Sequence, residues 1–276
     1  MAWYETGSGD PIVFLHGNPT SSYLWRKVIP HVAGLGRCIA PDLVGMGDSA
    51  KLVPSSDAAY SFKAHSEYLY GLLDALGVDK NVILVVHDWG SGLGFEWARM
   101  DPARVRGIAY MEAILRPTGP VDMGETQGGY FDMLRSAKGE ELVLQKNMFV
   151  DQMLIGGLKY YLTDEDMAEY RRPYLEPGEG RRPTLTWPRE LPLNGKPEVN
   201  DRIVQEYTQW LAGSQIPKLF VHAVPGAIFR DPAMLALARS LPNQREVTVY
   251  GGHFVQEVSG DAIGRALADW IPSLKA

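Results

Sequence analysis

A buried strand that stops at an ionisable turn constrains this chain more than any other feature. Residues 82–86 form an unbroken apolar run, which predicts a strand covered on both faces within a parallel sheet. The run ends at His87-Asp88-Trp89-Gly90, and apolar residues at helical spacing follow. Asp88 is therefore expected on a sharp turn between a central strand and a helix. By itself the residue fits two interpretations, a helix N-cap or a nucleophile.

The chemistry open to Asp88 follows from its charge. A carboxylate with an ordinary pKa of about 3.9 is ionised at neutral pH and needs no base before it attacks. It opens amides poorly, but it can displace a leaving group from saturated carbon and leave an alkyl ester on the protein. Hydrolysis of that ester requires a general base. Gly90, Gly92 and Gly94 allow the tight turn and close packing of the helix.

Strands and helices alternate along most of the chain, which predicts an α/β fold with a mostly parallel central sheet flanked by helices. The alternation stops between residues 117 and 213, where helical pieces are broken by Pro and Gly. We interpret 117–213 as a helical cap and residues 1–116 and 214–276 as the core. Helices are also expected at 23–32, 61–76, 232–241 and 260–274. Ligands of such sheets bind at the carboxyl ends of the strands, beneath the cap.

Three further polar residues follow predicted strands of the core. Asn18 follows the strand at 11–15, Glu112 ends the strand at 105–111, and His253 lies on a glycine loop after the last strand. Asn18 also fits an ordinary turn before proline, and Glu112 also fits a solvated loop. The apolar neighbours of Glu112 favour a buried carboxylate with a partner. The chain order of nucleophile, acid and histidine favours a catalytic His253.

Composition narrows the class of protein. The net charge of −6 gives no support for nucleic-acid binding, and no apolar run approaches the roughly 20 residues that span a bilayer. The start of the chain lacks the features of a signal peptide, and the single Cys38 excludes an internal disulfide and a cysteine-based zinc site. We expect a cytoplasmic protein without cofactor or metal. The glycine-rich loop at 41–49 lacks the lysine of a phosphate-binding loop.

Six stretches together carry a resemblance that covers nearly the whole chain. They are HGNPTSSYLWR (16–26), DLVGMGDS (42–49), VVHDWGSGLGFEWAR (85–99), YMEAI (110–114), RRPTLTWPR (181–189) and GGHFVQE (251–257). The sequence resembles the haloalkane dehalogenases of the α/β-hydrolase fold, in the subgroup whose catalytic acid follows the sixth strand.

The resemblance implies a role for each candidate residue. Asp88 is expected to attack the halogen-bearing carbon, and Asn18 and Trp89 to bind the departing halide through their N–H groups. His253 is expected to activate water against the ester, oriented by Glu112. The expected partners are a small hydrophobic halogenated substrate, water and a halide ion, in a monomer or weak oligomer. Residues matching family positions that line the substrate pocket are Phe131, Phe149, Pro188 and Ile228.

The chain departs from the family pattern in two places. The first edge strand of the sheet is expected to be missing, and the strand ending at Ala223 is followed by no acid, with Asp231 further on. Neither departure touches the candidate site. Three alternatives stay open: an epoxide hydrolase, a coelenterazine-type luciferase on the same scaffold, and a ligand-binding protein without catalysis.

Overall fold

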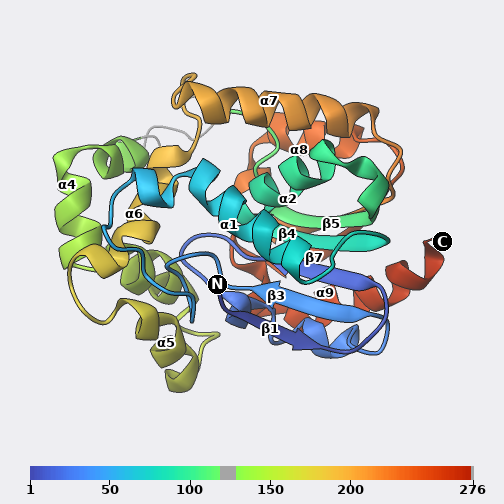
Figure 1. The fold of residues 1–276 in the computed structure, drawn as a ribbon, viewed down its shortest axis with the longest axis horizontal. Coiled ribbons are helices and arrows are strands. Elements are labelled where there is room, and N and C mark those ends of the chain that lie inside the picture. The colour runs from blue at the N-terminus through green and yellow to red at the C-terminus, as the bar shows by residue number, and fades with distance from the viewer. Residues whose placement is uncertain (119–128, 275–276) are drawn as a thin grey trace.

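A central sheet organises the computed structural model, which describes residues 1–118 and 129–274. Seven strands in this part of the chain lie in the order β1-β3-β2-β4-β5-β6-β7. All neighbouring pairs are parallel except β1 and β3, so the edge strand β1 runs against the others. The predicted mostly parallel α/β sheet is confirmed (Figure 1). The strands are β1 (Trp3–Thr6), β2 (Pro11–Leu15), β3 (Arg37–Pro41), β4 (Val82–Asp88), β5 (Val105–Ala113), β6 (Lys218–Pro225) and β7 (Gln244–Gly251).

The central strands bury both of their faces. Leu84 and Val86 of β4 belong to one hydrophobic core, and Ile83 and Val85 to the other, as the two-residue period of a strand requires. Helices α1 (Phe62–Ala75), α2 (Trp89–Met100), α7 (Glu198–Gly213) and α8 (Pro232–Ser240) contribute to the first core. Helix α9 (Val255–Trp270) and the short 3₁₀ turns η1 (Ser22–Trp25) and η2 (Ile29–His31) contribute to the second.

Two of the predicted helices differ in the structure. The helix expected at 23–32 is replaced by the 3₁₀ turns η1 and η2, because Pro30 lacks an N–H for a continuous helical ladder. Ser21, rather than Ser22, caps the first of them. The last helix was expected from residue 260. Helix α9 begins earlier, at Val255, directly after the glycine loop that carries His253, but Ser259 interrupts it with φ −126° and ψ 28°, so a helical segment does start at Gly260.

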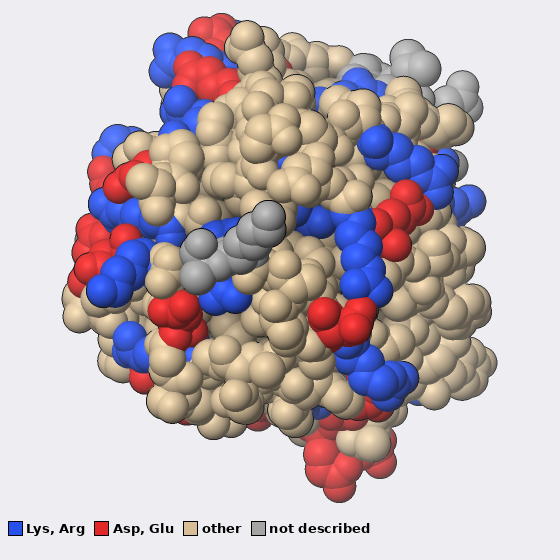
Figure 2. Space-filling model, turned by 90° about the vertical axis from the view of Figure 1, so that its right-hand side faces the viewer, with Lys and Arg blue, Asp and Glu red and all other residues tan. Residues whose placement is uncertain are grey.

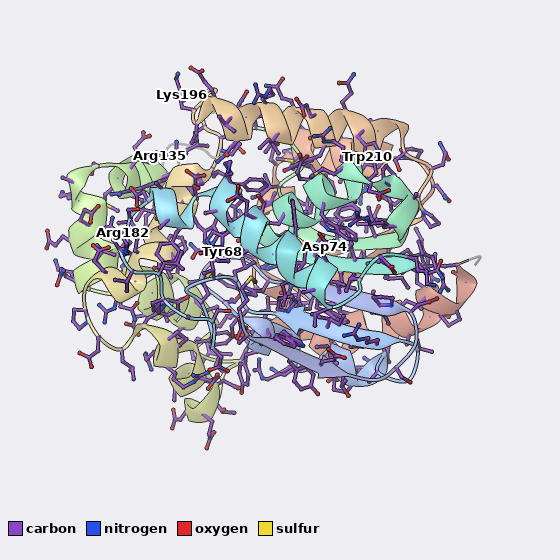
Figure 3. All side chains as sticks on the ribbon, viewed as in Figure 1. Tyr68, Asp74, Arg135, Arg182, Lys196 and Trp210 are labelled. Carbon is purple, nitrogen blue, oxygen red and sulfur yellow. The ribbon has the colours of Figure 1, made fainter. Side chains whose placement is uncertain are left out.

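A group of shorter helices lies at the left of the sheet in Figure 1, beyond the carboxyl ends of the parallel strands. Its members are α4 (Ala137–Gly139), the π-helical turns η5 (Glu140–Gln145) and η6 (Phe149–Gly156), α5 (Asp164–Arg171) and α6 (Arg182–Glu190). Helix α7 instead packs along α2, where the rings of Tyr207 and Phe95 lie 5.5 Å apart. Trp210 of α7 is partly buried against the hydrophobic core that contains Phe95 and Tyr207 (Figure 3). The division into core and cap stays a prediction, and this packing favours counting α7 with the core.

The surface on the right-hand side of Figure 1 carries basic and acidic side chains interspersed (Figure 2). Elsewhere in the chain's own contacts, Arg104 pairs with Asp101 and Asp74, and Arg245 pairs with Asp269, so neighbouring charges of opposite sign offset each other. Among the described residues, no helix combines the length and the hydropathy needed to cross a bilayer.

The turn from β4 into α2 requires glycine at position 90. A Cβ atom there would lie 2.2 Å from the carbonyl oxygen of Leu15 on the neighbouring strand β2. We expect Gly90→Ala to lower the free energy of unfolding by about 1–3 kcal/mol, the usual cost of forcing extra atoms into a packed core. Urea denaturation measures this change.

Gly71→Ala is the matched control. Gly71 lies within α1, and nothing approaches within 4 Å of the position its Cβ would take. The same substitution should raise the free energy of unfolding by about 0.5–1 kcal/mol, because alanine is the better helix former. Equal effects of the two substitutions would contradict the close approach of α2 to β2.

Candidate active site

Asp88 stands on a strained turn at the carboxyl end of β4. Its backbone has φ 49° and ψ −129°, a conformation that non-glycine residues rarely adopt. The Ser91 hydroxyl holds the turn from within α2: it donates to the Asp88 carbonyl at 2.5 Å and accepts the Ile114 N–H at 2.9 Å. Asp88 occupies the N-cap position of α2, but its side chain makes no capping hydrogen bond there. Its Oδ1 instead accepts the backbone N–H of Asn18 at 2.8 Å.

The structure brings Asp88, His253 and Glu112 together at the carboxyl edge of the sheet. His253 Nε2 lies 3.4 Å from Asp88 Oδ2, and His253 Nδ1 lies 3.3 Å from Glu112 Oε2. The imidazole therefore sits between two carboxylates from the adjacent strands β4 and β5. About 23% of the His253 side chain is exposed, and its surface lines the cavity described below.

The charges of the three groups support one another. Burial raises the pKa of the Asp88 carboxyl, but the hydrogen bond and charge of His253 outweigh it, so this pKa lies below its ordinary value. Burial lowers the pKa of His253, whereas Asp88 and Glu112 raise it to about 10. At neutral pH the site therefore holds an ionised Asp88 beside a protonated imidazole.

Glu112 is completely buried and is held by backbone donors. Its Oε2 accepts the N–H groups of Ala227 at 2.9 Å and Ile228 at 2.8 Å, in the loop that follows β6. This loop contains no acid of its own and supplies N–H groups to the Glu112 carboxylate instead. Asp231 has a different place: its carboxylate caps α8 through the N–H groups of Ala233 and Met234.

Trp89 and Asn18 lie beside Asp88 at the floor of the cavity. The Trp89 indole is stacked on Trp187 of α6, with ring centroids 4.6 Å apart and planes at 26°. The Asn18 side-chain N–H₂ donates to the Thr184 carbonyl of α6 at 3.2 Å, and its second N–H has no acceptor within the described part of the chain. Helix α6 thus orients both side chains.

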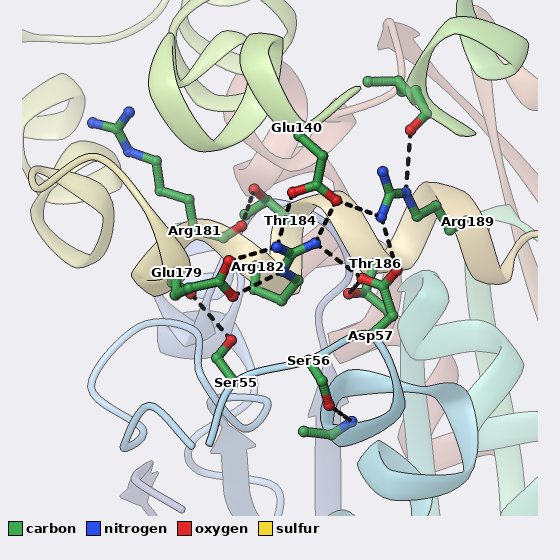
Figure 4. Close-up of polar contacts among 12 residues, drawn as sticks. Ser55, Ser56, Asp57, Glu140, Glu179, Arg181, Arg182, Thr184, Thr186 and Arg189 are labelled. Atoms are coloured by element: carbon green, nitrogen blue, oxygen red, sulfur yellow. Dashed lines mark hydrogen bonds and ion pairs between the residues drawn. The ribbon is translucent and has the colours of Figure 1, made fainter. Parts of the chain in front are cut away.

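Two arginines connect α6 to the rest of the cap and to the core (Figure 4). Arg182 forms ion pairs with Glu140 at 2.7 Å and with Glu179, and Arg189 reaches both Glu140 and Asp57. Asp57 belongs to the loop before α1, so these pairs link three separate segments. No helix was predicted at 182–190. Pro183 lies in the first turn of α6, where proline is tolerated, whereas Pro188 lies inside the helix.

A cavity of about 410 Å³ opens above Asp88 and is lined mostly by apolar side chains. All four predicted pocket residues line it, namely Phe131, Phe149, Pro188 and Ile228. Further lining residues that the sequence did not single out include Leu158, Leu191 and Tyr250. Neither the composition nor the spacing of apolar residues indicates that these positions line a cavity. The orientation of the cap decides which apolar side chains face it.

Within residues 1–118 and 129–274, no group of three or more His, Cys, Asp or Glu side chains is arranged to hold a metal ion. The arrangement can supply a carboxylate nucleophile, an imidazole beside it and N–H donors next to both. These groups suit a two-step displacement at carbon in a poorly hydrated cavity.

Comparison with known proteins gives consistent matches. The family model for the alpha/beta hydrolase fold matches residues 10–259. The chain is 52% identical to a haloalkane dehalogenase of Sphingobium indicum, over 100% of this chain and 93% of that protein. It is 47% identical to a haloalkane dehalogenase of Mycolicibacterium smegmatis, over 100% and 89%. The crystal structure of the haloalkane dehalogenase DbeA from Bradyrhizobium elkani superposes with a TM-score of 0.92 at 40% identity, covering 98% of this chain and 93% of that one.

The position of Asp88 predicts how His253 titrates. In the folded protein the raised pKa of His253 contributes stability that is complete below its ordinary pKa of about 6.5 and is lost as the pH rises through about 10. Asp88→Asn removes one of the two charges that raise this pKa, so we expect the ring to deprotonate at a lower pH. NMR titration of the His253 ring and urea denaturation between pH 6 and 10 measure both effects.

Asp231→Asn serves as the control, because Asp231 lines the same cavity but caps α8 and pairs with Arg116. It should leave the His253 titration where it is in the wild type. An unchanged titration in Asp88→Asn would show that Asp88 does not set the charge of the ring.

Proposed function

The chain belongs to the haloalkane dehalogenase family of the α/β-hydrolase fold, and we propose that it hydrolyses carbon–halogen bonds of small haloalkanes. The products are an alcohol, a halide ion and a proton. The observation that carries this proposal is an ionised carboxylate, Asp88, with an imidazole on one side and the indole of Trp89 and amide of Asn18 on the other, beneath an apolar cavity.

In the first step Asp88 displaces the halide. One carboxylate oxygen attacks the carbon, a carbon–oxygen bond forms, and the halogen leaves with the electron pair of its bond. Trp89 lines the cavity, and its indole N–H has no acceptor among the described residues, so this N–H is available to bind the anion. A halide in an apolar cavity needs such donors, because an unpaired anion out of water is costly. Trp89 and Asn18 supply two.

In the second step water hydrolyses the ester. The ester carries no charge at Asp88, so one of the two causes that raise the pKa of His253 disappears and the ring can give up its proton. The neutral ring then accepts a proton from water, and the hydroxide attacks the carbonyl carbon. The Asn18 backbone N–H, now 2.8 Å from Asp88 Oδ1, is placed to stabilise the oxyanion. The protonated ring then gives its proton to the departing alkoxide, which leaves as the alcohol. The new carboxylic acid loses the second proton of the water, which regenerates the Asp88 carboxylate.

The tyrosines of the cap favour halide displacement over epoxide opening. An epoxide hydrolase needs a phenol near the nucleophile to protonate the alkoxide. Of five tyrosines at 130, 160, 161, 170 and 174, Tyr161 is the one among the described cavity-lining residues, and it is 45% exposed. Tyr170 is committed to Glu257. These positions leave no buried phenol next to Asp88 in the described part of the cavity.

The proposed covalent step gives two variants with opposite signatures. Asp88→Ala should lower bromide release from 1-bromobutane by a factor of about 10⁴ or more, because no other group can form the ester. His253→Phe should instead release about one bromide per protein and stop, since the base for ester hydrolysis is gone. Intact-mass spectrometry should then find a butyl group on Asp88. Normal alcohol release by His253→Phe would refute the role of the ring.

Asn18→Ala separates halide displacement from epoxide opening. The substitution removes the side-chain amide but keeps the backbone N–H, so we expect bromide release from 1-bromobutane to fall about 10²-fold. Initial rates on 1-bromobutane and on 1,2-epoxybutane measure the two activities. Unchanged bromide release together with fast epoxide opening would favour the epoxide hydrolase alternative.

A further inference from the structure

His87 is a buried titratable residue that the mechanism above does not use. It immediately precedes Asp88 at the end of β4, and its side chain is fully buried. Its ring lies against the His253 ring, with centroids 4.7 Å apart and planes at 43°. A second imidazole therefore lies directly against the proposed base.

The hydrogen bonding of His87 defines a single form of its ring. Its Nε2 lies 2.8 Å from the backbone carbonyl oxygen of His253. A carbonyl only accepts, so Nε2 must carry the hydrogen. Burial and the neighbouring His253 lower the pKa of His87 to about 3, so the ring stays neutral and Nδ1 stays unprotonated. Nδ1 is buried and has no partner among the described residues.

The backbone of His253 needs such an anchor. The residue follows Gly251 and Gly252, and Gly251 has φ 154°, so local sterics restrict this loop weakly. The His253 side chain is held by two contacts of 3.3 and 3.4 Å to Glu112 and Asp88. One of these changes as soon as Asp88 becomes an ester. The bond from His87 joins the loop to the strand that carries the nucleophile and does not change during the reaction.

We propose that His87 is a positioning residue whose Nε2–H holds the backbone of His253 at a set distance from Asp88. The inference rests on the proposed function, because it concerns the base of the second step. His253 acts on water only after the ester has formed. Loss of the His87 bond should therefore slow ester hydrolysis and leave ester formation nearly unchanged, a split that general loosening of the fold would not produce.

The test compares three variants under rapid quench with 1-bromobutane. His87→Phe keeps a ring of similar size but removes the donor, and His87→Gln keeps an N–H donor. His222→Phe is the matched control: it makes the same change on strand β6 of the same sheet, where His222 pairs with Glu246 outside the cavity. Bromide burst, butanol formation and intact mass report ester formation, ester hydrolysis and the trapped intermediate separately.

His87→Phe should keep the bromide burst within about twofold of wild type and lower butanol formation about 10- to 100-fold, the usual cost of a misplaced catalytic group. Butyl ester should accumulate. His87→Gln should recover part of the hydrolysis rate, and His222→Phe should match wild type. Equal losses in both steps, or hydrolysis at the wild-type rate in His87→Phe, would overturn the proposal.

A measurement on the wild-type protein keeps the proposal testable if His87→Phe does not fold. ¹⁵N NMR of the histidine rings should show His87 as the neutral Nε2–H tautomer throughout pH 5–9. A protonated ring or the Nδ1–H tautomer in that range would overturn the proposed bond. Absence of bromide release by the wild type would refute the proposed function, whereas this NMR result tests the His87 bond independently of turnover.

Discussion

A negative charge buried beside an apolar cavity is the constraint on which the rest of the structure depends. Burial by itself favours the neutral form of Asp88, so the ionised form requires compensating partners. His253 supplies a positive charge 3.4 Å away, and Asn18 supplies a backbone N–H at 2.8 Å. These partners come from the loop after β7 and the loop after β2. The charge of the nucleophile is thus a property of the whole carboxyl edge of the sheet.

Backbone strain accompanies this arrangement at two neighbouring strand ends. Asp88 and Glu112 both have positive φ, at 49° and 43°, and end the adjacent parallel strands β4 and β5. Such conformations persist only where surrounding contacts enforce them. The Ser91 hydroxyl connects the turn at Asp88 to the N–H of Ile114, two residues after Glu112. One hydroxyl of α2 therefore restrains the backbone at Asp88 and just after Glu112.

One short helix of the cap, α6, contacts the side chains that are proposed to bind the halide. Helix α6 contributes a carbonyl from Thr184 to the Asn18 amide, the Trp187 ring to the Trp89 indole, and Pro188 to the cavity wall. Its position depends on ion pairs of Arg182 and Arg189 with acids from two other segments. The donors proposed to receive a halide thus belong to the core, while their orientation is set from the cap.

Most of the fold and the candidate site could be predicted from the sequence, because both depend on residue types and on the spacing of apolar residues along the chain. Apolar runs located the parallel strands, and Asp88, Glu112 and His253 stood where those strands end, so the sheet had to bring them to one edge. Roles in halide binding and the four pocket positions came from family resemblance, and the structure places all of those residues around the cavity.

The tertiary structure decided what no local pattern encodes. Two 3₁₀ turns replaced the expected helix at 23–32, α6 formed despite an internal proline, Pro188, and α7 packed on α2. The bonds to the carbonyls of Thr184 and His253 join residues 166 positions apart. Every residue carries a backbone carbonyl, so side-chain identity cannot indicate which one a buried donor will find. Only the folded packing of segments distant in sequence makes that choice.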